Sequence, residues 1–233
     1  MKKVWSISTT VRNPERLRNF LITLKEIENK EWNHETQLEF QARLVKNRFY
    51  GFASNQFYNN LPSQLVELIK NINHKITLSE AIYILEVRNY SEGIAIRGRT
   101  SYKPLEKMGL ASIINKKIKI TSLGKYLLQN DYDLGDMFFK SFLKWQYPNP
   151  VDRDFKDNKI YNLKPFILTL HLINRVNNLC ISKDIKVKGI SRLEFEIFGQ
   201  TLLNYTDLET QTDSLIDYCF CLICNGLWSY DKT

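Results

Sequence analysis

Apolar residues recur every three or four positions over much of this chain, which is the spacing of amphipathic helices. The first such pattern begins at Asn13-Pro14-Glu15, where Asn suits an N-cap, Pro the first turn and an acid the positive helix end. Further helices are predicted over 34–46, after Pro62, and after the capping box Thr77–Glu80. The first helix has one apolar face, made of Leu17, Phe20, Leu21, Leu24 and Ile27.

The segment from Arg97 to Leu110 predicts a short basic helix that is closed by Gly109. Pro104 is expected in its first turn, because a proline deeper inside a helix removes a hydrogen bond and clashes with the turn before it. Ser101 would then cap this helix.

Two short strands are predicted next, Ala111–Ile114 and Ile118–Ile120, joined by Asn115-Lys116-Lys117, with another helix starting at Thr121-Ser122. Two helices, a short basic helix and a two-stranded ribbon with a basic tip follow one another in the order of a winged helix-turn-helix. The alternating residues of Val4–Ser8 predict one more short strand.

A helix over 136–144 is expected to end at Trp145–Pro150, where two prolines lie close together. We therefore predict a basic winged-helix domain over 1–150 and a second, mainly helical domain over 151–233.

The second domain is predicted to contain a helix from Pro165, a capping box at Ser191–Glu194, a helix from Thr206 to Cys224 and a final strand at Leu227–Tyr230. The expected fold class is mainly α with small β-ribbons, that is, α+β.

The positive charge is concentrated in one part of the chain. The 233 residues carry 33 Lys+Arg and 25 Asp+Glu, a net charge of +8. Residues 1–150 balance at +9 and residues 151–233 at −1, while Arg88–Lys125 alone balances at +7. Such a local excess attracts polyanions. Anionic membrane surfaces, acidic substrates and a merely solvated basic face remain alternatives on charge alone.

Side chains of the predicted basic helix and ribbon are the candidate DNA contacts. Arg97 and Arg99 lie where a recognition helix enters the major groove, and arginine matches guanine O6 and N7 with two parallel donors. Ser101, Tyr102 and Lys103 are expected beside them. The candidate phosphate contacts, which would position the protein without reading sequence, are Lys107, Lys116, Lys117 and Lys119.

The sequence offers only weak evidence for a catalytic site. Metal nucleases use (Asp/Glu)-x-Lys pairs on core strands, and the best of four such tripeptides is Asp184-Ile-Lys186, with Asp152 or Asp154 as a distant partner. The composition predicts about two such tripeptides by chance. Cys219, Cys221 and Cys224 sit in an apolar run, which favours buried core thiols over a zinc site. We therefore predict no catalytic residue, metal site or cofactor in this chain.

No apolar run approaches the roughly 20 residues that span a bilayer, and the N-terminus lacks the apolar core of a signal peptide. An intracellular, cytoplasmic protein without a membrane partner is expected.

Several segments resemble the AlwI-type restriction endonucleases, which are type IIS enzymes closely related to strand-nicking endonucleases. The resemblance begins with Val4–Ser8 and Arg12–Leu17 and continues through Arg97–Leu110 and Ile118–Leu127. Its most specific part is Leu143-Lys-Trp-Gln-Tyr-Pro148, and weaker similarity follows at Ile190–Phe198 and Asn225–Trp228.

This resemblance implies two winged-helix-like subdomains that recognise a short asymmetric site in double-stranded DNA. Members of the family cleave outside that site with a separate nuclease domain, which uses Mg²⁺. No segment of these 233 residues resembles that nuclease domain, so cleavage is expected from a domain or subunit outside this chain. The alternatives are a winged-helix transcriptional regulator and a self-contained Mg²⁺-dependent nuclease using Asp184 and Lys186.

Overall fold

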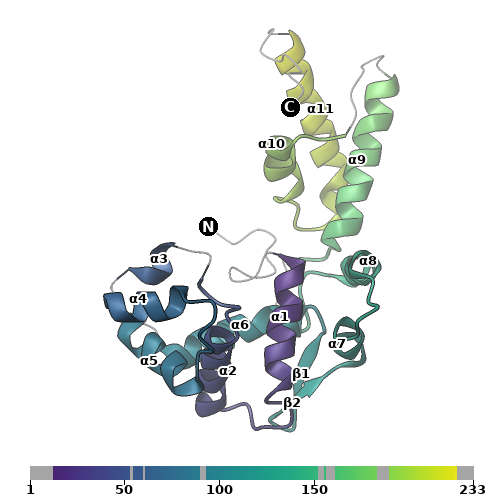
Figure 1. Cartoon of the computed structure of the whole chain (residues 1–233). Helices are drawn as coiled ribbons and strands as arrows, with labels where there is room; N and C mark the ends of the chain where they lie inside the picture. The colour runs from purple at the N-terminus through teal and green to yellow at the C-terminus, as the bar shows by residue number, and fades with distance from the viewer. Residues whose placement is uncertain are drawn as a thin grey trace. The chain divides into compact units, whose positions relative to one another are not determined.

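The structure, a computed structural model, describes residues 13–52, 55–59, 61–89, 93–151, 155, 161–182 and 189–224. These residues are mainly helical and include one small antiparallel sheet (Figure 1), so the α+β class is confirmed. The strands predicted at Val4–Ser8 and Leu227–Tyr230 lie outside the described residues.

The chain divides into two compact units. Among the described residues, those up to Met137 form the first unit and those from Phe138 onward form the second. The division lies within helix α8 (Leu134–Lys144), whereas the sequence predicted a boundary after Pro150.

The first unit contains seven labelled helices and a β-hairpin among its described residues. Its elements are α1 (Pro14–Lys25), α2 (His34–Lys46), α3 (Asn55–Tyr58), α4 (Ser63–Lys70), α5 (Leu78–Arg88), α6 (Ile94–Lys107), β1 (Ala111–Ile114), β2 (Lys117–Ile120) and α7 (Ser122–Leu127).

The predicted helix starts are confirmed where a side chain caps the helix. The Asn13 side chain accepts a hydrogen bond from the backbone N–H of Glu15 at 2.8 Å, and α1 begins at Pro14. At α5 the Thr77 hydroxyl and the Glu80 carboxylate each bond the other residue's backbone N–H, which is the reciprocal pattern of a capping box.

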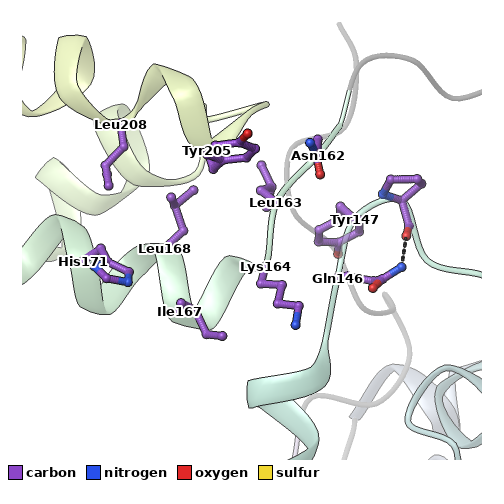
Figure 2. Close-up of a pocket in the computed structure, with 11 residues that line it drawn as sticks. Gln146, Tyr147, Asn162, Leu163, Lys164, Ile167, Leu168, His171, Tyr205 and Leu208 are labelled. Carbon is purple, nitrogen blue, oxygen red and sulfur yellow. Dashed lines mark hydrogen bonds between the residues drawn. The ribbon is translucent and has the colours of Figure 1, made fainter.

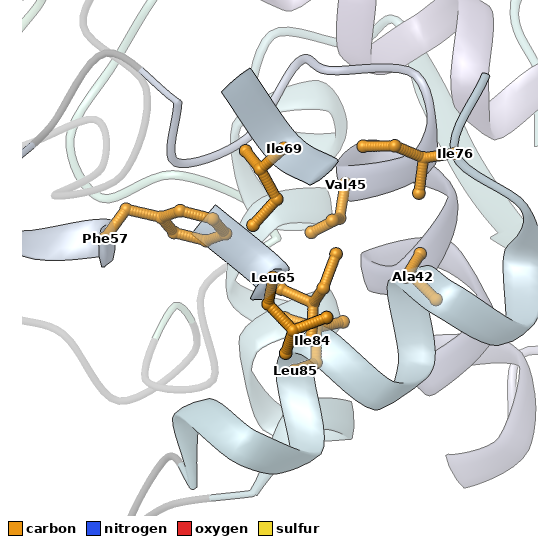
Figure 3. Packing of buried hydrophobic residues seen from close by; sticks show 9 residues of the cluster. Ala42, Val45, Phe57, Leu65, Ile69, Ile76, Ile84 and Leu85 are labelled. Carbon is orange, nitrogen blue, oxygen red and sulfur yellow. The ribbon is translucent and has the colours of Figure 1, made fainter. Parts of the chain in front are cut away.

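Helix α2 is the centre of the first unit. It packs most extensively on α6 and also on α5 and α1. Figure 3 shows Ala42 and Val45 of α2 within an apolar cluster, and the other members of this cluster are Phe57, Leu65, Ile69, Ile76, Ala81, Ile84 and Leu85. Burial of these side chains supplies the hydrophobic stabilisation of the unit.

Gly98 lets α6 lie against the backbone of α2. A Cβ atom at residue 98 would lie 1.9 Å from the carbonyl oxygen of Gln37. Only a residue without a side chain therefore fits at this crossing.

A charged network ties α2 to the segment that follows α1. Arg43 forms ion pairs with Glu26 and Glu39, and Lys30 reaches Glu39 at 2.8 Å. Burial raises the pKa of Glu39, but the hydrogen bonds from Lys30 and Arg43 outweigh that effect and leave the pKa below its ordinary value.

The second unit holds α9 (Pro165–Ser182), α10 (Arg192–Glu194), a π-helical turn (Phe195–Gly199), a 3₁₀ turn (Tyr205–Asp207) and α11 (Leu208–Cys224). Helix α9 begins at Pro165 as predicted, and Ser191 and Glu194 form the predicted capping box. The last helix was predicted to start at a Thr206 cap, but it begins at Leu208. The cap is Asn204, which begins a 3₁₀ turn just ahead of the helix. The described residues of this unit include two apolar clusters. One consists of Leu172, Val176, Cys180, Leu215 and Ile216, and the other of Leu163, Leu168 and Leu202.

Gly98→Ala is expected to destabilise the protein by about 1–3 kcal/mol, because the new methyl group forces α6 away from α2. Urea unfolding measures this loss. Gly135→Ala is the matched control, since a Cβ there meets nothing closer than Asp133 Oδ1 at 3.3 Å. Equal stabilities of the two variants would contradict the close crossing.

Glu39→Gln is expected to lower the free energy of unfolding at pH 7 by about 1–3 kcal/mol, because charge-assisted hydrogen bonds are lost. The folded pKa of Glu39 is lowered from 4.5, so its stabilisation is fully present above that pH and is lost as the pH falls through the folded pKa. Unfolding measured at pH 7 and pH 3 should show the difference shrinking in acid. The exposed Glu67→Gln should show neither effect.

Candidate nucleic-acid interface

Helix α6 carries the residues predicted to read DNA, but it is longer than the sequence suggested. It begins at Ile94, with Gly93 as N-cap, and runs to Lys107. Pro104 therefore lies well inside the helix and not in its first turn, and Ser101 does not cap it. Both predictions were wrong because packing of α6 against α2 outweighs the hydrogen bond that Pro104 cannot donate. The helix continues past this point, where the Met108 N–H bonds the Pro104 carbonyl at 3.0 Å.

Ser101 and Tyr102 point into the protein. Ser101 is fully buried and donates a hydrogen bond to Gln41 Oε1 of α2 at 2.9 Å. Tyr102 is 1% exposed and its ring lies 4.7 Å from that of Trp32. Burial, followed by the neighbouring Glu106 carboxylate, raises the pKa of Tyr102 far above its ordinary value, so the phenol stays neutral. The burial of Ser101 and Tyr102 removes both residues from the candidate interface.

The opposite side of α6 is basic and faces solvent. Arg99 is exposed, Lys103 lies one helical turn further on and is partly exposed, and Lys107 follows after another turn. Residues four apart share a helix face, so these three cations form one row about 12 Å long. Glu106 forms an ion pair with Lys103 and offsets one of the three charges. We call this row, Arg99, Lys103 and Lys107, the α6 basic row.

Arg97 lies outside this row, because it precedes Arg99 by two positions and points to nearly the opposite side of the helix. It is half-buried, with its Nε atom inaccessible to solvent. Ile96 is 37% exposed and precedes Arg99 by three positions, so it lies on the same face as the row. Sequence reasoning missed Ile96, because an apolar residue in an amphipathic helix predicts a core position. The only available signal was its helical spacing from Arg99.

The predicted ribbon is confirmed as the β1–β2 hairpin. Ala111 pairs with Ile120 at one end and Ile114 with Lys117 at the other, so only Asn115 and Lys116 form the turn. Both turn residues have positive φ, 49° and 60°, as a two-residue hairpin turn of the I′ type requires.

Backbone bonds from the segment between α1 and α2 hold this hairpin in place. The Trp32 N–H donates to the Lys116 carbonyl at 2.7 Å, and the Asn29 N–H donates to the Ile118 carbonyl at 2.9 Å. The Glu28 carboxylate accepts from the Ile120 N–H at 3.0 Å. The hairpin is therefore braced along β2 by a third stretch of chain.

The hairpin presents its lysines to solvent. Ile118 and Ile120 are buried, so the alternating Lys117 and Lys119 point to the other face. Lys116 and Lys117 are exposed, while Lys119 Nζ bonds Asn29 Oδ1 at 2.6 Å. Ile114, opposite Lys117, is 53% exposed. This face, with Lys116, Lys117 and Lys119, is the hairpin basic face.

The catalytic and metal candidates receive no further support. Asp152, Asp154, Asp184 and Lys186 lie outside the described residues, as do the side chains of Cys219, Cys221 and Cys224. The Cys180 side chain is buried within the second unit. No three His, Cys, Asp or Glu side chains come together as a metal site within the part of the chain that the structure describes.

None of the described helices combines the length and apolar character needed to cross a membrane.

One protein-family model matches part of the chain. Residues 106–219, which are 114 of the 233, match the model described as the AlwI restriction endonuclease. This match supports the AlwI-type restriction endonuclease family. That family implies sequence-specific restriction of DNA, that is, hydrolysis with DNA as the substrate. The comparison with curated proteins gave no match.

The AlwI match includes the hairpin basic face, Lys107 and most of the second unit. It begins just after Lys103, so Arg97 and Arg99 lie outside it. The positive charge of Arg99 and Lys103 is therefore an observation independent of the family match.

Arg99→Ala and Lys117→Ala are each expected to reduce the salt slope of DNA binding by about 0.9, because each removes one phosphate-neutralising charge. The slope is the change of the logarithm of the association constant with the logarithm of salt concentration, measured with a random-sequence duplex.

Ser101→Ala is the structural control for this measurement. It deprives Gln41 of its hydrogen-bond donor and should cost about 1–3 kcal/mol of unfolding free energy with an unchanged salt slope. A reduced slope in Ser101→Ala and none in Arg99→Ala would place the interface on the wrong face of α6.

Proposed function

We propose that this chain is the recognition part of a type IIS restriction or nicking endonuclease and binds a short asymmetric site in double-stranded DNA. The observation that supports this most is the α6 basic row, which faces solvent while Ser101 and Tyr102 of the same helix are buried. A helix with a basic, accessible face is what the major groove admits.

In this proposal the two basic surfaces have different tasks. Arg99 contacts a guanine edge, because its guanidinium can donate two parallel hydrogen bonds to O6 and N7. Lys103 and Lys107 contact base edges or phosphates along the same groove. The hairpin basic face lies near the sugar-phosphate backbone and fixes the register of α6 without reading sequence.

The winged-helix interpretation of the first unit is part of this proposal. Helix α5, helix α6 and the β1–β2 hairpin succeed one another in the order that the motif requires. The α1–α2 segment that pairs with β2 gives the hairpin a rigid base, as a phosphate-contacting wing needs. A single such unit binds without a two-fold axis, which agrees with an asymmetric site.

Cleavage is assigned to a nuclease domain or subunit outside these 233 residues. That domain would hold the Mg²⁺ ion, which polarises the scissile phosphate and activates water. The described residues of this chain do not gather three His, Cys, Asp or Glu side chains at one place for that ion. The second unit would brace the first, add DNA contacts or dock the nuclease domain.

Selection of bound sequences from a random duplex pool, followed by footprinting, tests the proposal. We expect one short asymmetric motif bound by one copy of the chain. A palindrome bound by two copies would instead indicate a transcriptional regulator. Recovery of no preferred motif at moderate salt would overturn sequence-specific recognition.

Incubation with plasmid DNA and Mg²⁺ tests the assignment of cleavage. The chain alone is expected to leave the plasmid intact. Site-specific cutting that is abolished by Asp184→Ala would contradict this assignment and support the self-contained nuclease.

A further inference from the structure

A cavity of about 470 Å³ lies in the second unit and belongs wholly to the segment that matches the AlwI family. Its volume falls within the roughly 300–1,000 Å³ typical of small-molecule sites. Gln146, Tyr147 and Pro148 line it, and these residues come from the segment with the most specific family resemblance. The basic surfaces of the first unit do not account for this cavity.

Backbone hydrogen bonds preform the cavity. Tyr147 and Leu163 exchange both of their backbone bonds, at 2.8 and 3.1 Å. The Asn162 N–H donates to the Leu203 carbonyl at 3.0 Å, and the Tyr205 N–H donates to the Asn162 carbonyl at 3.2 Å. Three extended segments therefore lie side by side and hold the lining residues in fixed positions. Figure 2 shows these segments meeting the start of α9.

The cavity combines an apolar floor with an aromatic mouth. Leu163 and Leu168 are buried and pack with Leu202 beneath it. The Tyr147 ring is fixed against Trp145 and Tyr161, at centroid distances of 6.3 and 5.9 Å. Tyr205 is 60% exposed, so its ring is accessible to a ligand. Exposed aromatic rings beside an apolar floor are the elements that stack nucleobases.

Several polar side chains around the cavity have no bonding partner among the described residues. Among the described residues, the side chains of Asn162, Lys164, His171 and Tyr205 make no hydrogen bond or ion pair, and Gln146 Nε2 reaches only the Pro148 carbonyl at 3.5 Å. Lys164 directly precedes α9, whose 18 residues direct a positive helix end toward the same place. None of the described lining residues carries a carboxylate. The site therefore offers amide donors and acceptors together with positive charge.

We propose that this cavity binds one nucleotide, with its base on the Tyr205 ring, its edge bonded by the amides of Gln146 and Asn162, and its phosphate at Lys164. An apolar side chain of a protein partner would fill the floor but leave these amides and the ammonium group unused. The inference rests on the proposed DNA-binding function and adds a nucleotide subsite to it.

The nucleotide has two possible sources. A base inside a duplex is stacked and paired, so only an unpaired or extruded nucleotide of DNA can enter such a cavity. A free mononucleotide offers the same chemistry. The two sources are separated by the choice of probe.

Fluorescence of 2-aminopurine tests the inference with three probes: a duplex with one unpaired 2-aminopurine nucleotide, the same duplex fully paired, and free 2-aminopurine deoxyribonucleoside 5′-monophosphate. The wild-type chain is expected to bind the first at least about tenfold more tightly than the second, because one base–aromatic stack is gained. Tyr205→Ala and Lys164→Ala should lose most of that preference. Tyr83→Ala, which removes a 54% exposed tyrosine of the first unit, should retain it.

The outcomes separate this inference from the proposed function. Equal affinity of the wild type and both cavity variants for every probe overturns the nucleotide site, and a selected DNA motif would still stand. A third outcome is that the wild type binds the free nucleotide but neither duplex, and that both cavity variants lose this binding. This result supports the nucleotide site with a free nucleotide as its ligand, and it contradicts DNA recognition. Equal losses in Tyr205→Ala and Tyr83→Ala would also overturn the site. Unchanged melting temperatures verify that the variants fold.

Discussion

The close crossing of α2 and α6 is the constraint on which the first unit depends. The Gln37 carbonyl occupies the space that a side chain at Gly98 would need, and one turn later Ser101 bonds Gln41. These contacts fix the rotation of α6 about its own axis. With Gly98 and Ser101 turned inward, Arg99 and Lys103 must face solvent, because residues on opposite faces of a helix cannot exchange places without breaking its packing. The position of the basic row is thus a consequence of core packing.

Backbone hydrogen bonds from the segment between α1 and α2 hold the hairpin in place. Its strands are short, and an isolated two-stranded hairpin is marginally stable in water. Here the Asn29 and Trp32 N–H groups bond the backbone of the hairpin, and the charged network around Glu39 holds the same α1–α2 segment to α2. Helix α2 therefore supports both surfaces proposed to contact DNA, one by direct packing and one through this segment.

Local signals predicted the elements well. Helix α2 was predicted over 34–46 and has those bounds, and the capping boxes at Thr77 and Ser191 mark helix starts as expected. The hairpin agrees to within one residue. Each of these features is determined by neighbouring residues, through alternation, capping or turn geometry.

Predictions that depended on distant contacts were wrong or incomplete. The helix around Pro104 was predicted too short, since only its packing on α2 explains why a proline is tolerated there. Ser101 and Tyr102 are polar in sequence, yet α2 and Trp32 give them partners in the core. The cavity of the second unit joins residues from 146 to 208, and no sequence spacing brings those together.

Base reading by Arg99 on the solvent face of α6 can be tested by substituting lysine for this residue. Lysine keeps the charge but cannot donate two parallel hydrogen bonds to a guanine. Affinities of the wild type and Arg99→Lys should be measured for the selected site and for every single-base variant of it. Arg99→Lys should leave the affinity for random duplex nearly unchanged and should lose about 1–3 kcal/mol of discrimination at one base pair. Unchanged discrimination at every position of the site would contradict base reading by Arg99.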